Sequence, residues 1–179
     1  MEEEKSLLEK LFDNGIFVIT SNINEKTAHD LIFSLLDFSA NNPEKEIKLY
    51  ISSGSDDYLN IFAIYDVVKS LPNPVSTYSI GGVSDMSLVF PCLGNKGKRY
   101  ALENTVFYFS EVVGILSEGQ QTDIEILAKD TARTRVSFES ILSNATGKSV
   151  DQIHSDLLKG IKLSAKEAKE YGLIDEVMK

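Results

Sequence analysis

The residues with the clearest chemical meaning form the stretch Ser79-Ile80-Gly81-Gly82-Val83-Ser84-Asp85-Met86-Ser87. An apolar strand, two glycines and a second apolar segment predict a sharp strand-to-helix turn, the kind of turn that exposes a nucleophile in hydrolases. At its tip, where a hydrolase needs serine, the sequence has Asp85. The stretch therefore predicts the backbone of a peptidase-like site without the nucleophile.

A serine hydrolase also needs a histidine that accepts the serine proton and a carboxylate that orients this histidine. The chain has two histidines, His29 and His154, and both lie in segments with helical periodicity rather than after a predicted strand. We expect both to be helix-surface or half-buried side chains rather than a catalytic base. Ser84 and Ser87 flank the turn, but no base lies near them in the sequence, which argues against a displaced nucleophile.

Paired carboxylates are the remaining acid–base chemistry. Asp85 and Glu111 are predicted to meet in one pocket, as are Asp56 and Asp57, and two carboxylates can divide acid and base work. The chain has 27 acidic residues, however, so such pairs also arise by coincidence. The sequence has no metal-ligand spacing and no phosphate-binding P-loop, and Gly81-Gly82 alone is a weak signal. We therefore expect no cofactor and no metal.

Composition limits the function classes. The 179 residues are enough for one domain, which we place at residues 1–179, and the net charge of −9 argues against a nucleic-acid partner. The lone Cys92 excludes an intrachain disulfide and lies in an apolar run typical of a core. No apolar run reaches the roughly 18 residues that cross a bilayer, and Met1-Glu2-Glu3-Glu4-Lys5 is unlike a signal peptide. We expect no membrane association and a cytoplasmic location, although an organellar or viral protein would have the same composition.

Hydrophobic periodicity predicts the elements that position these residues. Strands are predicted at residues 15–20, 47–51, 75–80, 99–102 and 105–109, and helices at residues 7–12, 25–41, 58–71, 84–93, 122–144, 149–158 and from Ser164 to Gly172. This alternation indicates an α/β fold with parallel β–α–β units. Ligands in such sheets bind beyond the C-terminal strand ends, which here carry the loops from Ser52 to Asp56, Gly81 to Asp85 and Ser110 to Gly114.

Burial is predicted from the same patterns. The run from Gly15 to Thr20 is continuously apolar, so we expect a strand that is buried on both faces. The inner faces of the next two helices are predicted at Leu31, Leu35, Leu36 and Phe38, and at Ile61, Ile64, Tyr65 and Val68.

Several segments resemble ClpP, the proteolytic subunit of the Clp protease. They are Asn42-Pro43-Glu44-Lys45-Glu46-Ile47-Lys48-Leu49-Tyr50-Ile51, Ala63-Ile64-Tyr65-Asp66, Val75-Ser76-Thr77, Gly97-Lys98-Arg99-Tyr100-Ala101-Leu102, Gly119-Gln120-Gln121-Thr122-Asp123-Ile124-Glu125, Ser164-Ala165-Lys166-Glu167-Ala168 and Tyr171-Gly172-Leu173-Ile174-Asp175. The resemblance runs in register from about Leu8 to Met178, with one extra residue between Ser110 and Gly119.

The resemblance implies an α/β, ClpP/crotonase-like fold of repeated β-β-α and β-α-β units with a protruding handle helix. It places a head at about residues 8–110 and 145–179 and a handle at about residues 111–144. Members of the family stack as two heptameric rings around a closed chamber, and the handles join the rings. An ATPase of the Hsp100 type feeds the chamber.

The family's Ser-His-Asp triad, carried over residue by residue, falls on Asp85, Ser110 and Asp156. Only the aspartate matches. The family's glycine pair, which supplies oxyanion amides, falls on Ser55 and Asp56. These simultaneous losses at the nucleophile, the base and the oxyanion loop indicate relaxed selection on catalysis.

Further departures from the family lie close to the same positions. The glycine after the methionine of the turn is replaced by Ser87, and the proline after the histidine and glutamine is replaced by Val112. Pro91 lies inside the helix predicted behind the turn, where it removes a backbone hydrogen bond.

The resemblance also bears on partners. Only residues 1–6 precede the first predicted helix, fewer than the family's axial hairpin needs, which counts against docking of an Hsp100-type ATPase through that hairpin. We likewise expect no counterpart of the family's C-terminal tail. Tyr50 matches an aromatic residue of the family's docking cleft, or is a strand residue that packs inward.

We therefore expect a non-catalytic ClpP-like subunit of the ClpR type that forms or joins a ring. The ring is expected as a heptameric or tetradecameric homo-oligomer, or as a hetero-oligomer with active ClpP, because the handle carries the apolar residues Ile124, Ile126, Leu127 and Val136. Two alternatives stay open. One is a crotonase-like enzyme with Asp85 or Glu111 as general base, and the other is a stand-alone homo-oligomeric scaffold.

Overall fold

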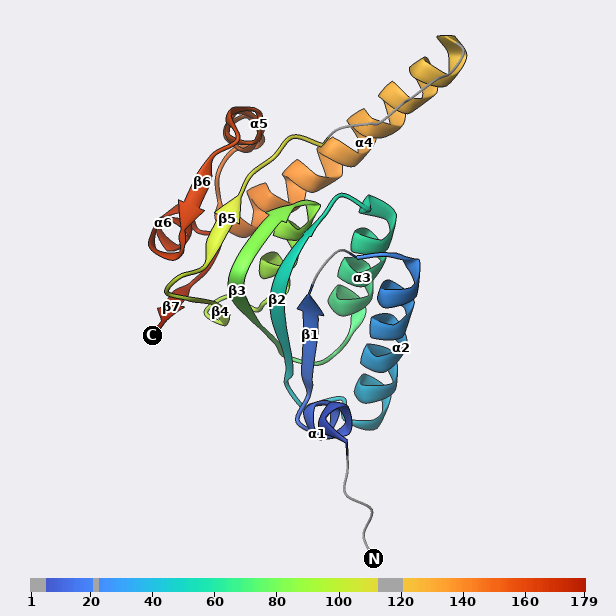
Figure 1. Cartoon of the computed structure of the whole chain (residues 1–179), viewed down its shortest axis with the longest axis vertical. Coiled ribbons are helices and arrows are strands. Elements are labelled where there is room, and N and C mark those ends of the chain that lie inside the picture. The colour runs from blue at the N-terminus through green and yellow to red at the C-terminus, as the bar shows by residue number, and fades with distance from the viewer. Residues whose placement is uncertain (1–5, 21–22, 113–120) are drawn as a thin grey trace, which may run out of the picture.

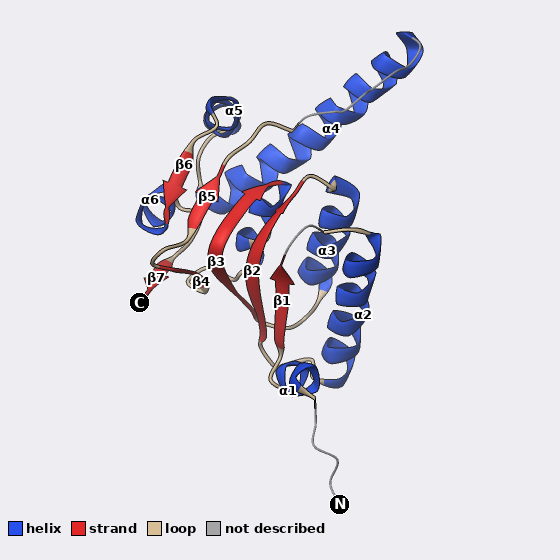
Figure 2. Cartoon of the chain, viewed as in Figure 1, coloured by secondary structure: helices blue, strands red, loops and turns tan. Residues whose placement is uncertain are grey.

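The computed structural model describes residues 6–20, 23–112 and 121–179, in which strands and helices alternate along most of the chain (Figures 1 and 2). The strands are β1 (Ile16–Thr20), β2 (Ile47–Ser55), β3 (Val75–Asp85), β4 (Arg99–Leu102), β5 (Val106–Tyr108), β6 (Lys162–Ser164) and β7 (Glu176–Met178). The helices are α1 (Leu7–Asp13), α2 (Glu25–Asn41), α3 (Tyr58–Ser70), α4 (Gln121–Thr146), α5 (Val150–Lys159) and α6 (Ala165–Tyr171), with 3-10 turns η1 (Met86–Val89) and η2 (Pro91–Leu93).

The strands form one mixed sheet, of seven strands within the described residues. Its order is β1-β2-β3-β4-β7, all paired in parallel, and β5 branches from the C-terminal half of β3 and pairs antiparallel with β6. Parallel neighbours need crossover connections, which α2 and α3 supply between β1, β2 and β3. The predicted α/β class with a largely parallel sheet is confirmed.

The core includes one face of the first strands with helices α2 and α3, which run side by side in Figure 1, and it continues through η1 and η2 to residues of α4, α5 and α6. Ile47, Leu49 and Ile51 of β2 are fully buried, as are Leu35 of α2 and Ile61 of α3. Both ends of α2 are set by nearby capping residues: Asn24 and Thr27 form a capping box at its first turn, and Asn42 caps its last turn. The helix predicted from Ser164 to Gly172 is α6, in which Ser164 and Glu167 form a capping box at the start and the left-handed Gly172 ends the helix.

Two burial predictions are wrong. Strand β1 is not buried on both faces, because buried and exposed residues alternate along it and Val18 is 47% exposed. On α2, Leu36 is 44% exposed although we predicted it on the inner face. Successive helical residues are separated by 100°, so the buried Leu35 turns Leu36 toward solvent. Tyr65 of α3 is half-buried.

Two element boundaries near the predicted turn are also wrong. Ser52 to Ser55 of the predicted loop from Ser52 to Asp56 belong to β2, and the predicted loop from Gly81 to Asp85 is the end of β3. The predicted helix at residues 84–93 is instead two 3-10 turns, and Pro91 begins the second of them. At a first helical position the missing N–H of proline removes no hydrogen bond, so the predicted loss does not occur.

The predicted long helix at residues 122–144 is α4, which extends away from the sheet in Figure 1. Of the predicted handle, residues 113–120 lie outside the described residues. Tyr50 does not pack into the core, because it points to the sheet face opposite its buried neighbours Leu49 and Ile51. There its ring stacks on Tyr78 at 4.7 Å, and Tyr78 stacks on Tyr100 at 5.1 Å.

Candidate functional site

Asp85 stands at the end of β3, on a sharp turn into η1. Its φ of 55° is the one positive φ of a non-glycine residue in the described part of the chain. Such a conformation costs on the order of 1–3 kcal/mol and persists only where its surroundings hold it. The turn is therefore strained in the way that exposes a side chain at a strand end, as the sequence predicted for Asp85.

Strand register explains how the surroundings hold this turn. Ile51 pairs with Ser79 and Ser53 pairs with Val83, so β3 inserts extra residues at its two glycines before pairing resumes. Gly54 and Ser84 are then opposite each other, and a Cβ at Gly54 would collide with the Ser84 Oγ atom. The next pair joins Ser55 to Asp85, which brings the loop after β2 beside the turn.

The Asp85 carboxylate is bound on both oxygens. Ser84 Oγ donates a hydrogen bond of 2.7 Å to Asp85 Oδ2, and Ser110 Oγ donates one to Asp85 Oδ1. Ser110 follows β5, whose Tyr108 pairs with Ser84 of β3, so adjacent strand ends bring the two residues together. Asp85 and Ser110 are thus direct neighbours, and Ser84 is engaged as a donor to Asp85.

These residues open into a cleft of about 670 Å³ beside α4. Its lining is Gly54, Ser55, Asp56, Asp57, Tyr58, Asp85, Met86, Ser110, Glu111, Val112, Leu127, Asp130, Thr131 and Thr134. Five of these side chains are carboxylates, and the described lining includes no lysine, arginine or histidine. Asp85 and Glu111 share one cleft, as we predicted, and so do Asp56 and Asp57. Asp57 also caps α3, where it accepts hydrogen bonds from Asn60.

The backbone amide of Ser55 is not available to a ligand. It donates a hydrogen bond of 3.1 Å to Ser87 Oγ, which is buried and also lies 3.1 Å from Ser53 Oγ. An oxyanion hole needs amide donors that point at the reacting oxygen. The loop at Ser55 therefore lacks one such donor, and the buried Ser87 hydroxyl is not an exposed nucleophile.

Asp156 does not line the cleft. It lies on α5, buried, where Gln152 Nε2 donates to its Oδ1 atom and Tyr171 OH donates to its Oδ2 atom, both at 2.8 Å. Burial and, next, the hydrogen bond to Asp156 raise the pKa of Tyr171, so the phenol keeps its proton and stays a donor. The partners of Asp156 are therefore side chains of α5 and α6.

Both histidines lie on helices, as predicted. His29 is exposed on α2 beside the Phe33 ring, and His154 on α5 contacts the Glu139 carboxylate of α4. Neither lines the cleft. Cys92 is buried, and burial raises the pKa of its thiol to about 12, which fits the predicted core role.

The described residues include no cluster of three or more histidine, cysteine or acidic side chains that could hold a metal ion. Over the same residues, none of the helices has the length and apolarity needed to cross a membrane.

Sequence reasoning missed the α4 side of the cleft. Asp130, Thr131 and Thr134 line it, together with Leu127. Their spacing of three and four residues is the signal of one helix face, but the sequence alone does not say which face meets the turn.

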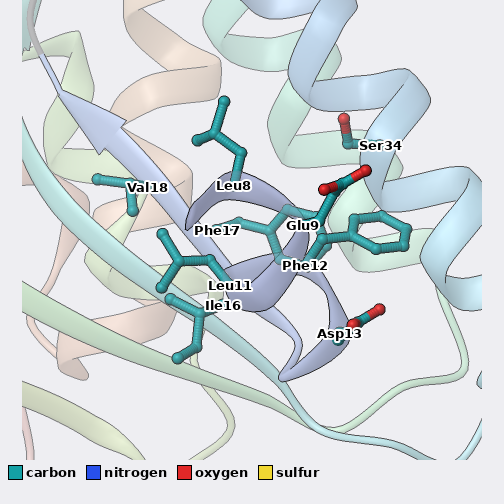
Figure 3. Close-up of a pocket in the computed structure, with 9 residues that line it drawn as sticks. All are labelled: Leu8, Glu9, Leu11, Phe12, Asp13, Ile16, Phe17, Val18 and Ser34. Atoms are coloured by element: carbon teal, nitrogen blue, oxygen red, sulfur yellow. The ribbon is translucent and has the colours of Figure 1, made fainter. Parts of the chain in front are cut away.

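A second hollow, of about 510 Å³, lies between α1, β1 and α2, and Figure 3 shows the side chains that line it. Its lining is largely apolar and includes Leu8, Leu11, Ile16 and Val18. Leu8 is 77% exposed. Contiguous exposed apolar side chains of this kind mark contact surfaces between proteins.

A model of the Clp protease family matches residues 1–179 of the chain. The mixed sheet with parallel strands, flanked by helices, is consistent with the ClpP/crotonase-like fold of this family. Its members typically form ring oligomers. Because the match extends over the whole sequence, the chain belongs to the Clp protease family.

Proposed function

We propose that this protein is a non-catalytic, ClpR-type subunit that forms or joins a ring-shaped Clp peptidase assembly. The observation that carries the proposal is the hydrogen bond of Ser110 to Asp85 at the tip of the strained turn. In this proposal Asp85 stands at the place of the nucleophilic serine and Ser110 at the place of the histidine. A carboxylate that accepts a hydrogen bond from a serine hydroxyl cannot act as a histidine-activated nucleophile.

The surroundings of this pair support the loss of catalysis. No histidine lines the described cleft, the Ser55 amide is bound to Ser87, and the carboxylates of the lining repel a developing oxyanion. Loss of triad members costs roughly 10⁴ to 10⁶ in turnover, even where the oxyanion donors remain. Asp156, the third triad position in this proposal, is held by Gln152 and Tyr171.

The proposal predicts that the pure protein cleaves neither a fluorogenic peptide nor casein above the uncatalysed background. The matched control is the Asp85→Ala variant, which removes the carboxylate and leaves the rest of the cleft in place. Wild type and variant are expected to be equally inactive, alone and with a serine-reactive inhibitor. Inhibitor-sensitive cleavage by the wild type would contradict the proposal.

Exposed apolar side chains support assembly. They lie at the hollow of Figure 3, with Leu8 and Val18, and on the projecting part of α4, with Ile124 and Ile126. A monomer in water gains nothing from exposing such groups, whereas a ring contact buries them. A cytoplasmic location and a head and handle within one domain of residues 1–179 are part of the same proposal.

Native mass spectrometry tests the assembly, alone and after mixing with an active ClpP. We expect a heptamer, a tetradecamer or a mixed ring, and smaller species for Leu8→Glu and Ile126→Glu. Leu158→Glu, at an exposed leucine of α5, is the control that leaves the mass unchanged. A stable wild-type monomer would exclude both the homo-oligomer and the stand-alone scaffold, and absence of mixed rings would exclude the hetero-oligomer.

A further inference from the structure

The cleft beside α4 gathers negative charge that no described side chain pairs with. Asp56, Glu111 and Asp130 line it from three separate segments, and their carboxylates make no hydrogen bond or ion pair with a described residue. The described lining has no lysine, arginine or histidine, and the sequence of residues 113–120, which follows Val112, has none either. A cleft lined by charges of one sign concentrates ligands of the opposite sign.

A cationic side chain next to the cleft is directed elsewhere. Arg135 of α4 lines an adjoining hollow, which shares Glu111 and Leu127 with the cleft. The Arg135 Nε atom lies 3.9 Å from Glu139 Oε1, and among the described residues Arg135 forms no ion pair with Glu111. Arg135 therefore does not pair with the carboxylates of the cleft.

One hydroxyl in the wall of the cleft also lacks a partner. Thr134 of α4 lines the cleft and is only 7% exposed, and its hydroxyl makes no hydrogen bond with a described residue. Its oxygen is not among the fully enclosed side-chain atoms without a partner, so the exposed part of Thr134 includes this oxygen, which faces the cleft. A largely buried hydroxyl is unfavourable unless something bonds to it. Asp130 lies one turn earlier on the same helix face, so a ligand can reach both.

The distribution of the carboxylates determines which cation fits. Within the described residues, no three acidic, histidine or cysteine side chains are grouped so that they could hold a metal ion. The carboxylates instead surround a volume of about 670 Å³. A compact ion cannot reach several of them, whereas a flexible chain with several ammonium groups can. Met86, Val112 and Leu127 also line the cleft, and their apolar side chains suit the methylene segments of such a chain.

We propose that this cleft binds an aliphatic polyamine, a chain of protonated amines separated by methylene groups. The ammonium groups pair with the carboxylates of Asp56, Glu111 and Asp130, and an amine N–H donates to the Thr134 hydroxyl. The inference rests on the proposed function only in using the same cleft. Its test measures binding rather than cleavage, so either proposal can fail without the other.

Isothermal titration calorimetry of the intact protein with spermine, at low and constant ionic strength near pH 7, tests the site. Because several ammonium groups engage at once, we expect spermine to bind about tenfold more tightly, or better, than 1-butylamine or Mg²⁺. Glu111→Gln combined with Asp130→Asn should weaken spermine binding about 25-fold, at about fivefold for each lost pair. Asp66→Asn combined with Glu170→Gln is the matched control, since these exposed carboxylates of α3 and α6 lie outside the cleft. It has the same net charge and should keep the wild-type affinity.

Thr134→Val keeps the shape of the side chain and removes the hydroxyl. We expect it to weaken spermine binding about fivefold, whereas a purely structural hydroxyl would change the melting temperature and leave the affinity unchanged. The proposal is wrong if spermine does not bind or binds no better than Mg²⁺. It is also wrong if the cleft and control double variants weaken binding equally, which would show attraction to the net charge alone, or if Thr134→Val binds spermine as tightly as the wild type.

Discussion

The strongest single perturbation that the structure predicts is Asp175→Asn. The Asp175 carboxylate accepts hydrogen bonds from the Gly97 and Arg99 amides at 2.8 and 3.0 Å, and from Arg99 Nε and Nη2 at 3.0 and 2.6 Å. Arg99 Nη1 also donates to the Ala145 carbonyl at 2.9 Å. One guanidinium thus joins β4, the C-terminal segment and the end of α4.

The magnitude follows from burial. The side chains of Arg99 and Asp175 are 9% and 18% exposed, so Asp175→Asn leaves a buried guanidinium without its counter-charge. Breaking such a pair costs about 3 kcal/mol, at the lower end of the range for buried pairs because the Asp175 side chain is partly exposed to solvent. With a urea m-value of about 2 kcal/mol/M, the unfolding midpoint falls by about 1.5 M.

The pH dependence has a defined sign. Burial by itself would raise the pKa of Asp175, but the hydrogen bonds and charge of Arg99 outweigh it and hold this pKa below its usual range. The stability difference between wild type and Asp175→Asn is therefore fully present above about pH 4, the usual range for aspartate. It shrinks as pH falls through the lowered folded-state pKa.

Urea unfolding followed by circular dichroism, at constant protein concentration and several pH values, measures this difference. Glu46→Gln, in the more exposed pair with Lys98, is the control and is expected to cost far less. Arg99→Met added to Asp175→Asn should recover part of the loss, because the unpaired charge is then gone. A difference near zero at pH 7, or one that persists undiminished at pH 2, would refute the reasoning.

Three further outcomes are expected. Cys92 should resist alkylation at pH 8 in the folded protein and react in urea, as read by mass spectrometry, because burial raises its pKa to about 12. Gly172→Ala should lower the free energy of unfolding by about 2 kcal/mol in thermal unfolding, since the φ of Gly172 is +94° and a Cβ would lie 2.7 Å from the Thr146 carbonyl oxygen. Gly147→Ala is the control and should cost less, because the φ of Gly147 is +76° but a Cβ there would meet no other atom within 4 Å. Tyr171→Phe should cost about 1.5 kcal/mol in urea unfolding by removing one donor from buried Asp156, and an unchanged midpoint would contradict that.

Local sequence patterns were sufficient to predict the positions of most helices. Helix α3 was predicted within one residue at its C-terminal end, because Ile61, Ile64 and Val68 repeat on one face. The bounds of α6 were also predicted from local sequence, since Ser164 and Glu167, which cap its first turn, are close to each other along the chain. Such signals need no information from distant residues.

The ends of β2 and β3 could not be predicted in this way. Ser52 to Ser55 and the glycines of β3 have low strand propensity, so they favour a loop. They form strand because the two segments pair with each other, and Gly54 is needed there only because Ser84 of β3 approaches it. That requirement depends on a residue about thirty positions away, which periodicity does not record.

Only part of the candidate site could be predicted, because the rest again depends on residues that are far apart in the sequence. The residues next to Asp85 in the sequence were sufficient to predict that it lies at the end of a strand, and the family resemblance placed Ser110 at the end of another strand. The bond of the Ser55 amide to Ser87, the pair of Glu139 with His154 and the hydrogen bonds of Asp156 all depend on side-chain directions. These directions follow from packing rather than from spacing.

The crotonase-like alternative makes a separate prediction. Acyl-thioester chemistry needs amide donors for an enolate oxygen, and the Ser55 amide is already bound to Ser87. Acyl-CoA is also strongly anionic, whereas the described cleft lining has five carboxylates and no cationic side chain. We expect acetyl-CoA and crotonyl-CoA, at about 1 mM, to leave the melting temperature unchanged, since only binding to the folded state raises it. A concentration-dependent rise that Asp85→Asn abolishes would instead show that the carboxylate at the turn serves a ligand, and that the cleft accepts an anion in spite of its charge.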